Sequence, residues 1–205
     1  MEYEGPTRED LANVHALNRA WLKLQRQDTE DRSRLSRDRL ERLAATPFLL
    51  FSLSEHDDSR WRSLLDRGPQ QDLLDARIDV STELLALQAA GLAILWDLAR
   101  RNPYVARLVT GAPLQWCELI ASTTLIRILN RVTHSPVIES RFDGECTLSR
   151  RLWRRGGSAL PELRVFSQIG ALQSMLTSRE LVPYRRMPAA ACRMPRQAER
   201  IGDKV

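Results

Sequence analysis

An arginine cluster near residue 150 holds the side chains best suited to bind a charged ligand. The stretch SRRLWRRGGS, residues 149–158, sets four cations around Trp153: Arg150, Arg151, Arg154 and Arg155. On a helix these form two pairs four residues apart, so like charges repel one another and an anionic partner would relieve the repulsion. Arginines bind phosphates without reading the base sequence, and the binding weakens with salt. The stretch is a candidate nucleic-acid contact, and the alternative is a solvated basic linker ending at Gly156-Gly157.

The positive charge of the chain is concentrated in its last third. The 205 residues carry 31 Lys+Arg and 26 Asp+Glu, a formal net charge of +5. From Arg141 to the end there are 13 cations and 6 anions, whereas residues 1–140 hold 18 and 20. Only Lys23 and Lys204 are lysines, so the number of arginines fits a GC-rich genome as much as it fits chemistry. The location of the surplus is the informative part.

A second candidate contact is a helix-turn-helix in NPYVARLVTGAPLQWCELIAS. We expect helices over 104–109 and 114–122, with Gly111 in the turn. In such motifs the start of the second helix meets the major groove. The candidate contacts are Gln115 and Glu118 on the second helix and Arg107 on the first. Trp116 and Cys117 suit a groove poorly and the second helix has no arginine, so a packed helical corner is the favoured alternative.

Residues for catalysis, metal binding or cofactor binding are not grouped in this sequence. His15, His56 and His134 are scattered, and His56 lies in a polar loop with two aspartates, which we interpret as solvated. Hydrolase, Walker-type and zinc-protease signatures are missing. Three isolated cysteines form no CxxC pair and an odd number argues against a disulfide framework, which favours a reducing cytosol. We therefore expect no enzyme, no metal and no cofactor.

Hydrophobic periodicity predicts an all-α protein with one or two short extended segments. Thr7 and Asp10 are placed to cap the first helix, and Pro47 and Pro136 each end a helix before an apolar extended run. Predicted helices cover 8–27, 35–46, 60–67, 70–101, 104–109, 114–122, 123–135 and 161–180, and the extended runs are 48–53 and 137–142. The apolar stripe of the helix over 161–180 consists of Leu163, Phe166, Ile169, Leu172, Met175 and Leu176. No apolar run is long enough for a membrane span.

The chain contains two similar segments. RLERLAATPFLLFSL (39–53) and RILNRVTHSPVIESRF (127–142) share the pattern R-(x)-L-x-R-[LV]-x-x-[TS]-P-[FV]-[LI], 89 residues apart. Upstream, 17–27 aligns with 92–102 at an offset of 75, so the second copy holds 14 extra residues. Such recurrence indicates a tandem of a short copy and a complete copy. The alternative is two ordinary amphipathic helices that each end in a proline turn.

The complete copy, residues 80–143, resembles the FlhD family of flagellar master transcription regulators. The resemblance rests on a Leu-rich first helix and three later motifs: Ala106-Arg107-Leu108, Leu119-Ile120-Ala121 with Thr124-Leu125, and Arg141-Phe142-Asp143. The short copy, 35–53, is similar to the last helical segment of that family at Leu35, Leu43, Ala44, Thr46 and Leu49. This chain departs from the family because it is about twice as long and holds two copies.

The resemblance implies a multi-helix bundle of two FlhD-like units that activates transcription. Such subunits dimerise and bind promoter DNA with an FlhC-like partner, and related activator pairs occur on integrative conjugative elements. We expect units over 1–66 and 67–145, a basic linker and helix over 146–180, and a disordered basic tail over 181–205. A fused pair would replace the family's homodimer by an internal pseudo-dimer, although a homo-oligomer is also open.

Large apolar side chains are the candidate partner interface. Trp21, Trp96, Leu92 and Leu95 could anchor a partner, because tryptophan is enriched at interface centres. They are equally suited to an ordinary core, and we expect three of the five tryptophans to be buried within the chain. The sequence therefore predicts a cytoplasmic, DNA-binding activator subunit in a heteromeric complex. The alternative is an adaptor or anti-regulator that binds protein and not DNA.

Overall fold

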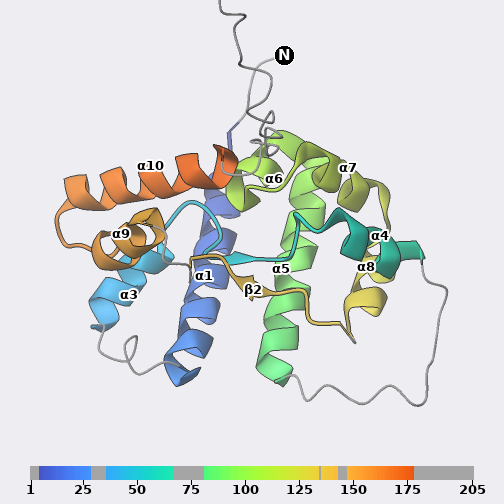
Figure 1. The fold of residues 1–205 in the computed structure, drawn as a ribbon, viewed down its shortest axis with the longest axis horizontal. Coiled ribbons are helices and arrows are strands. Elements are labelled where there is room, and N and C mark those ends of the chain that lie inside the picture. The colour runs from blue at the N-terminus through green and yellow to red at the C-terminus, as the bar shows by residue number, and fades with distance from the viewer. Residues whose placement is uncertain (1–4, 29–35, 67–80, 134, 143–146, 178–205) are drawn as a thin grey trace, which may run out of the picture.

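The computed structural model describes residues 5–28, 36–66, 81–133, 135–142 and 147–177. Within them the chain is helical apart from two short strands, which confirms the all-α prediction (Figure 1). The elements are α1 (Arg8–Asp28), α3 (Arg37–Ala44), β1 (Phe51–Ser52), α4 (Asp58–Asp66), α5 (Thr82–Arg101), α6 (Pro103–Thr110), α7 (Leu114–Ser122), α8 (Leu125–Val132), β2 (Glu139–Ser140), α9 (Thr147–Arg155) and α10 (Pro161–Thr177). The predicted tail over 181–205 lies outside the described residues.

The same order of elements occurs twice along the chain. A long helix, a short helix, a strand and a last helix make up α1-α3-β1-α4, which we call the first half, and α5-α8-β2-α9, which we call the second half. The second half inserts α6 and α7 after its long helix, where the sequence comparison placed 14 extra residues. Helices α4 and α9 begin and end 89 residues apart, so the repeat continues beyond the segment that the sequence revealed.

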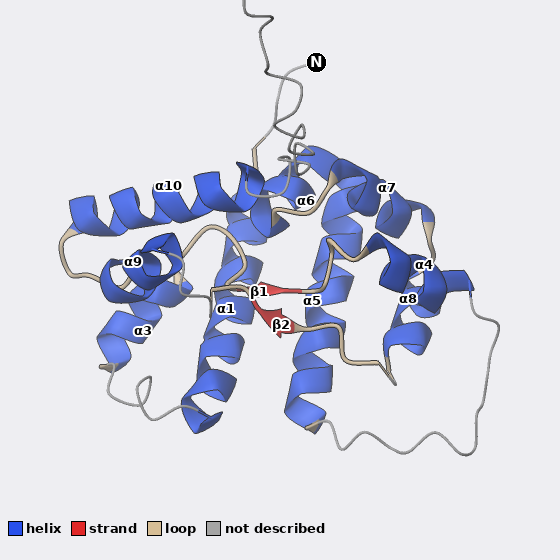
Figure 2. Cartoon of the chain, viewed as in Figure 1, coloured by secondary structure: helices blue, strands red, loops and turns tan. Residues whose placement is uncertain are grey.

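The two strands of this repeat pair with each other. Strands β1 and β2 are antiparallel, with Phe51 opposite Ser140 and Ser52 opposite Glu139. They meet in front of the long helices α1 and α5, which pack side by side (Figure 2). Asp10 near the start of α1 binds Arg101 at the end of α5 at 2.6 Å, so these helices run antiparallel. Antiparallel long helices and antiparallel strands are the arrangement expected of two halves related by a two-fold rotation.

Each half places its last helix on the other half. Helix α4 packs on α8 of the second half, and Arg127 of α8 donates to the carbonyl of Leu65 at 2.6 Å. Helix α9 ends against α3 of the first half, and Arg39 of α3 donates to the carbonyl of Arg154 at 2.6 Å. Leu65 and Arg154 occupy equivalent positions of the repeat, so the same arginine-to-carbonyl contact closes both halves. The last helices are thus exchanged between the halves.

A buried carboxamide on each long helix fixes the segment that follows the short helix. Asn18 of α1 donates to the carbonyls of Ala44, Thr46 and Phe48 at 3.3, 3.2 and 2.9 Å, and its oxygen accepts the Leu50 N–H at 2.9 Å. Gln88 of α5 donates to the Val132 carbonyl at 2.9 Å and accepts the Val137 N–H at 2.7 Å. Both side chains are buried, so these bonds satisfy backbone groups that a proline turn leaves without ladder partners.

The apolar side chains of both halves form one shared core. Phe48, Phe51, Leu92 and Leu95 are at most 1% exposed, and Trp21 packs on the Phe51 ring at 5.5 Å between centroids. Trp61 of α4 meets Trp116 of α7 edge-on at 5.5 Å, which ties the exchanged helix to the second half. Trp21, Trp61 and Trp116 are buried while Trp96 and Trp153 are half-buried, which confirms the expectation that three of the five are core residues.

Several local predictions are confirmed by the structure. Thr7 and Asp10 exchange hydrogen bonds at 2.9 and 3.1 Å and so form the expected capping box of α1. The helices on either side of Gly111 are present, and Gly111 has a φ of 69°, the left-handed conformation that ends α6. The predicted extended runs contain β1 and β2. Helix α10 begins at Pro161 as expected.

Three predictions about the chain after residue 80 are wrong or incomplete. Residues 147–155, interpreted as linker, form α9, because Leu152 is buried and Gly156 closes the helix on the Leu152 carbonyl at 2.7 Å. The apolar stripe of α10 is divided: Leu172 and Met175 pack against the core, while Phe166 and Ile169 are 61% and 58% exposed. Helix α5 is long and apolar enough to span a membrane, which the sequence reading did not single out. It packs against α1, α6, α7 and α8.

Candidate nucleic-acid interface

The four arginines of α9 occupy three different environments. Arg150, Arg154 and Arg155 are exposed, and no carboxylate of the described residues lies within ion-pair distance of them. Arg151 is half-buried, with its guanidinium carbon 5.5 Å from the centre of the Phe166 ring of α10. Leu152 and Trp153 face the body, and the Trp153 indole donates to the Phe142 carbonyl at 3.0 Å. The interior contacts fix the helix, so its exposed cations are presented on a rigid element.

Helix α3 adds further cations at the carboxyl end of α9. Arg39 donates to the carbonyls of Trp153 and Arg154 at 3.1 and 2.6 Å, and Arg42 donates to the Gly157 carbonyl at 3.0 Å. These guanidinium groups neutralise the negative end of the α9 dipole. A Cβ at Gly157 would lie 2.5 Å from the Arg39 carbonyl oxygen, so only glycine permits this approach. We call Arg39, Arg42, Arg150, Arg154 and Arg155 the basic face.

The equivalent helix of the first half does not share this charge. Helix α4 carries Asp58, Arg60, Arg62 and Asp66, which sum to zero, whereas α9 carries four arginines and no acid. Arg62 binds Asp58 at 2.9 Å and Arg60 binds Glu139 at 3.2 Å, so the arginines of α4 are used in ion pairs. A general excess of arginine in the chain would have affected both helices. The charge of α9 is therefore specific to that position.

Gln115 and Arg107 are not brought to the basic face. Figure 1 shows α7 and α9 on opposite sides of the view, with α1, α5 and α6 between them. Gln115 and Glu118 of α7 are exposed, while Trp116, Cys117 and Ile120 on the same helix are buried. Arg107 is half-buried on α6. The two helices have the bounds of the predicted motif, and the exposed side of α7 offers one amide and one carboxylate near its start.

Three of the four predicted partner-interface residues are core residues, so that prediction is wrong for them. Trp21, Leu92 and Leu95 are at most 3% exposed, because α1 and α5 turn these side chains toward each other and toward the strands. Trp96 alone remains accessible. Its indole donates to the Thr123 carbonyl at 2.7 Å, and Arg100 stacks on the ring at 4.7 Å. Trp96 borders a shallow hollow of about 440 Å³ that also reaches Ile126, which is 73% exposed.

The sequence analysis did not identify a polar network beside the antiparallel pair of β1 and β2, which we call the strand crossing. Glu55, 1% exposed in its side chain, binds Arg141 at 2.5 Å and accepts from the Ser52 hydroxyl and the Leu53 N–H at 2.7 Å each. Burial alone would raise the pKa of Glu55, but the Arg141 charge and these hydrogen bonds outweigh it and the pKa lies below its usual value. Arg141 also donates to the carbonyls of Phe51 and Thr110. Sequence gave no signal for this pair, since the partners lie 86 residues apart.

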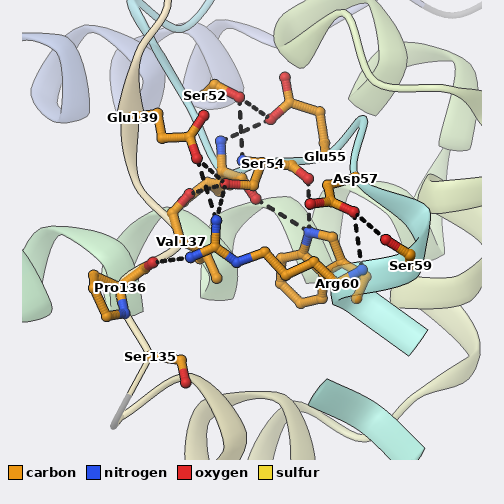
Figure 3. Close-up of polar contacts among 12 residues, drawn as sticks. Ser52, Ser54, Glu55, Asp57, Ser59, Arg60, Ser135, Pro136, Val137 and Glu139 are labelled. Carbon is orange, nitrogen blue, oxygen red and sulfur yellow. Dashed lines mark hydrogen bonds and ion pairs between the residues drawn. The ribbon is translucent and has the colours of Figure 1, made fainter. Parts of the chain in front are cut away.

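A second ion pair closes the same crossing from the outside. Arg60 of α4 reaches the Pro136 carbonyl, the Ser54 hydroxyl and the Glu139 carboxylate, and Ser54 itself donates to the Val137 carbonyl at 2.8 Å (Figure 3). Ser54 has a φ of 51°, a left-handed conformation at the turn from β1 to α4. Every member of this group has a partner within the chain. The network therefore serves to lock the exchanged segments.

The remaining nucleophile and metal candidates within the described residues are structural. Burial raises the pKa of the Cys117 thiol to about 12, so it stays neutral in the core. No group of three or more His, Cys, Asp or Glu side chains in the described part of the chain could hold a metal ion. His56 lies 3.9 Å from the Glu55 carboxylate at the edge of the strand crossing.

Comparisons with known proteins add no assignment: no family model, no curated protein and no solved structure matches the chain.

Proposed function

We propose that the chain is a transcription-activating subunit that holds DNA through its basic face and works with a second, FlhC-like protein. The proposal combines the resemblance of residues 80–143 to FlhD subunits with the position of the arginines on α9. The basic face would bind the phosphate backbone, and the partner would supply much of the base reading. The alternative is an adaptor that binds only protein.

The observation that carries the proposal is the charge difference between α4 and α9. These helices occupy equivalent positions in the two halves, yet one is neutral and the other carries four arginines. Like charges crowded on a short helix cost free energy unless an anion is present. Arg39 and Arg42 of α3 add two more cations beside it. A concentrated, rigid and one-sided set of arginines is the usual footprint of a phosphate-binding surface.

The fold also supports a relation to dimeric regulators. The two halves pack around one antiparallel strand pair, with exchanged last helices, as two subunits of a homodimer would. A chain that builds this arrangement within itself would supply in one polypeptide what two FlhD-like subunits supply together.

The test is the salt dependence of binding to double-stranded DNA, measured by fluorescence anisotropy with the purified chain. Each lost phosphate contact reduces the slope of log affinity against log salt by roughly 1, so Arg150→Gln with Arg154→Gln should reduce it by about 2. Arg8→Gln with Arg62→Gln removes the same charge from exposed positions elsewhere and should change the slope little. An equal decrease of this slope in both variants would show that only the net charge of the chain matters. No binding by the wild-type chain at low salt would favour the adaptor.

A further inference from the structure

The outer side of α10 is an exposed apolar surface, and the guanidinium carbon of Arg151 lies 5.5 Å from the centre of its Phe166 ring. Its body side is fixed by buried Ser167 and Ala171, by Met175 against Gly111, and by Gln168, which donates to the Thr46 hydroxyl at 3.4 Å. Turned away from the body are Leu160, Leu163, Val165, Phe166 and Ile169, which are 61%, 37%, 50%, 61% and 58% exposed. They account for five of the seven large exposed hydrophobic residues of the described chain.

The spacing of these residues makes one continuous stripe. At 100° per residue, Val165, Phe166 and Ile169 lie within about 100° of each other on the exposed side of the helix. Exposed apolar patches on the order of a few hundred Å² mark interaction sites in soluble proteins. Leu172 and Met175 of α10 face the core and Phe166 and Ile169 are exposed, so the helix offers apolar side chains on both sides.

Charge decides between the candidate occupants of this stripe. The described exposed side of α10 has one anion, Glu162, near its start and no cation, so it offers no pattern for a strongly acidic partner. The chain's own residues 178–205 carry seven cations and three anions and include Pro183, Pro188 and Pro195. Prolines at that spacing prevent a complementary helix, and the arginines of α9 would repel the segment. A second α10 is already a helix, and its two charges, Glu162 and Arg164, cancel.

We infer that two copies of this chain associate through α10, with the two helices antiparallel. A register that sets Phe166 opposite Ile169 of the second copy also sets Glu162 opposite Gln173, so apolar residues meet at the centre and polar residues meet at both ends. Antiparallel helices also place opposite ends of their dipoles side by side. A contact made by one helix of each chain is smaller than a standard permanent interface, so we expect a reversible dimer with dissociation at about 1–100 µM.

This contact is separate from the internal pairing of the two halves. The strand crossing is filled by β1 and β2 of one chain, whereas α10 follows the repeat and belongs to neither half. It also does not depend on DNA binding, because α9 presents Arg150, Arg154 and Arg155 on exposed positions of a different helix. Either proposal can fail without the other.

Sedimentation equilibrium of the nuclease-treated chain tests the inference. The wild type should approach twice the 23.5 kDa chain mass as concentration rises from about 1 to about 100 µM. Phe166→Ser with Ile169→Ser should shift dissociation at least tenfold upward, while far-UV circular dichroism stays unchanged. Tyr104→Ser with Ile126→Ser removes two apolar residues elsewhere that are 58% and 73% exposed, and should leave the association unchanged.

Three outcomes would overturn the inference. The first is a wild-type chain that stays monomeric throughout this range. The second is a Phe166/Ile169 variant that dimerises as the wild type does. The third is a dimer that dissociates as salt is added, because an apolar contact bordered by arginines should persist or strengthen when their repulsion is screened. The last result would indicate an ionic interface on another surface.

Crosslinking tests the register. In a chain with Cys146→Ser and Cys192→Ser, the buried Cys117 remains and Ile169→Cys adds one exposed thiol on the stripe. A short bismaleimide should link two such chains in high yield, and Ile126→Cys in the same background should give none. A dimer that sediments as such but cannot be linked through residue 169 would assign the contact to a different surface and contradict the inference.

Discussion

Phe51 and Ser140 face each other across the two-stranded sheet, and their separation of 89 residues is also the separation of Pro47 and Pro136. A residue pairing with its own repeat equivalent marks the position of a two-fold axis in an antiparallel pair. The axis therefore passes through the strand crossing, and the contacts on its two sides can be compared directly. The buried carboxamides, the arginine-to-carbonyl contacts and the last helices all occur on both sides.

Asn18 and Gln88 should be among the most sensitive positions in the chain. Asn18→Ala leaves a buried N–H and several carbonyls without partners, so we expect a loss of about 3 kcal/mol in the free energy of unfolding. Gln88→Ala should cost about 2 kcal/mol for the same reason. Gln115→Ala on the exposed side of α7 is the control. Urea unfolding monitored by tryptophan fluorescence measures all three, and near-neutral core variants would contradict the assigned role.

Gly157 should tolerate no side chain. A Cβ there would lie 2.5 Å from the Arg39 carbonyl oxygen, which is backbone and cannot rotate away. Gly157→Ala should therefore cost about 2 kcal/mol in the free energy of unfolding and weaken the packing of α9 against α3. At Gly5 nothing lies within 4 Å of an added Cβ, so Gly5→Ala should be neutral. Thermal unfolding of both variants checks the difference, and equal melting temperatures would exclude the close approach.

The stability of the fold should decrease in acid. Arg141 and hydrogen bonds hold the pKa of Glu55 below its usual 4.5, and Arg101 with Thr7 does the same for Asp10, in each case against the effect of burial. A lowered folded pKa means that the unfolded chain binds more protons, so this stability is complete above about pH 5 and is lost as pH falls through the folded values. Melting temperature against pH measures the decline.

Glu55→Gln measures how much of the acid-dependent stability comes from Glu55. It leaves the buried Arg141 charge without its carboxylate, so we expect a loss of about 3 kcal/mol at neutral pH. The variant should also lose less stability than the wild type on going from pH 6 to pH 3. Parallel pH curves for the two proteins would show that Glu55 is not one of the groups responsible.

Cys117 should be unreactive in the folded chain. Its thiol is buried and its pKa is raised to about 12, so almost no thiolate forms near neutral pH. In a chain with Cys146→Ser and Cys192→Ser, Ellman's reagent should react only after denaturant is added. Rapid reaction of the folded protein would mean that the α6–α7 corner opens readily.

The periodic parts of this fold were accessible from the sequence, and the packing between halves was not. Thr7 with Asp10, Pro47 and Pro136 gave local signals that place helix ends correctly. Helix α9 was missed because its sequence is dominated by arginines, which hide the few apolar positions such as Leu152. The division of the α10 stripe could not be predicted, because periodicity alone does not show that Leu172 and Met175 meet the core while Phe166 and Ile169 stay exposed.

The candidate sites could be predicted only in part, because packing between distant segments also decides which residues join them. The arginines of α9 stand together in the sequence and could be identified as a group, whereas Arg39 and Arg42 join them only through the exchange of last helices. Trp21, Leu92 and Leu95 suit an interface or a core equally well by residue type. Only the antiparallel packing of α1 on α5 assigns them to the core.

The joining of two halves in one polypeptide has a genetic consequence. In a homodimer every substitution occurs in both subunits at once, so a change that suits one side must be tolerated on the other. Here each half can mutate by itself while the strand crossing keeps them together. That independence accounts for a neutral α4 opposite an arginine-rich α9, and for a corner of two extra helices on one half alone. The molecule can thus keep a dimer's architecture and yet present two different faces.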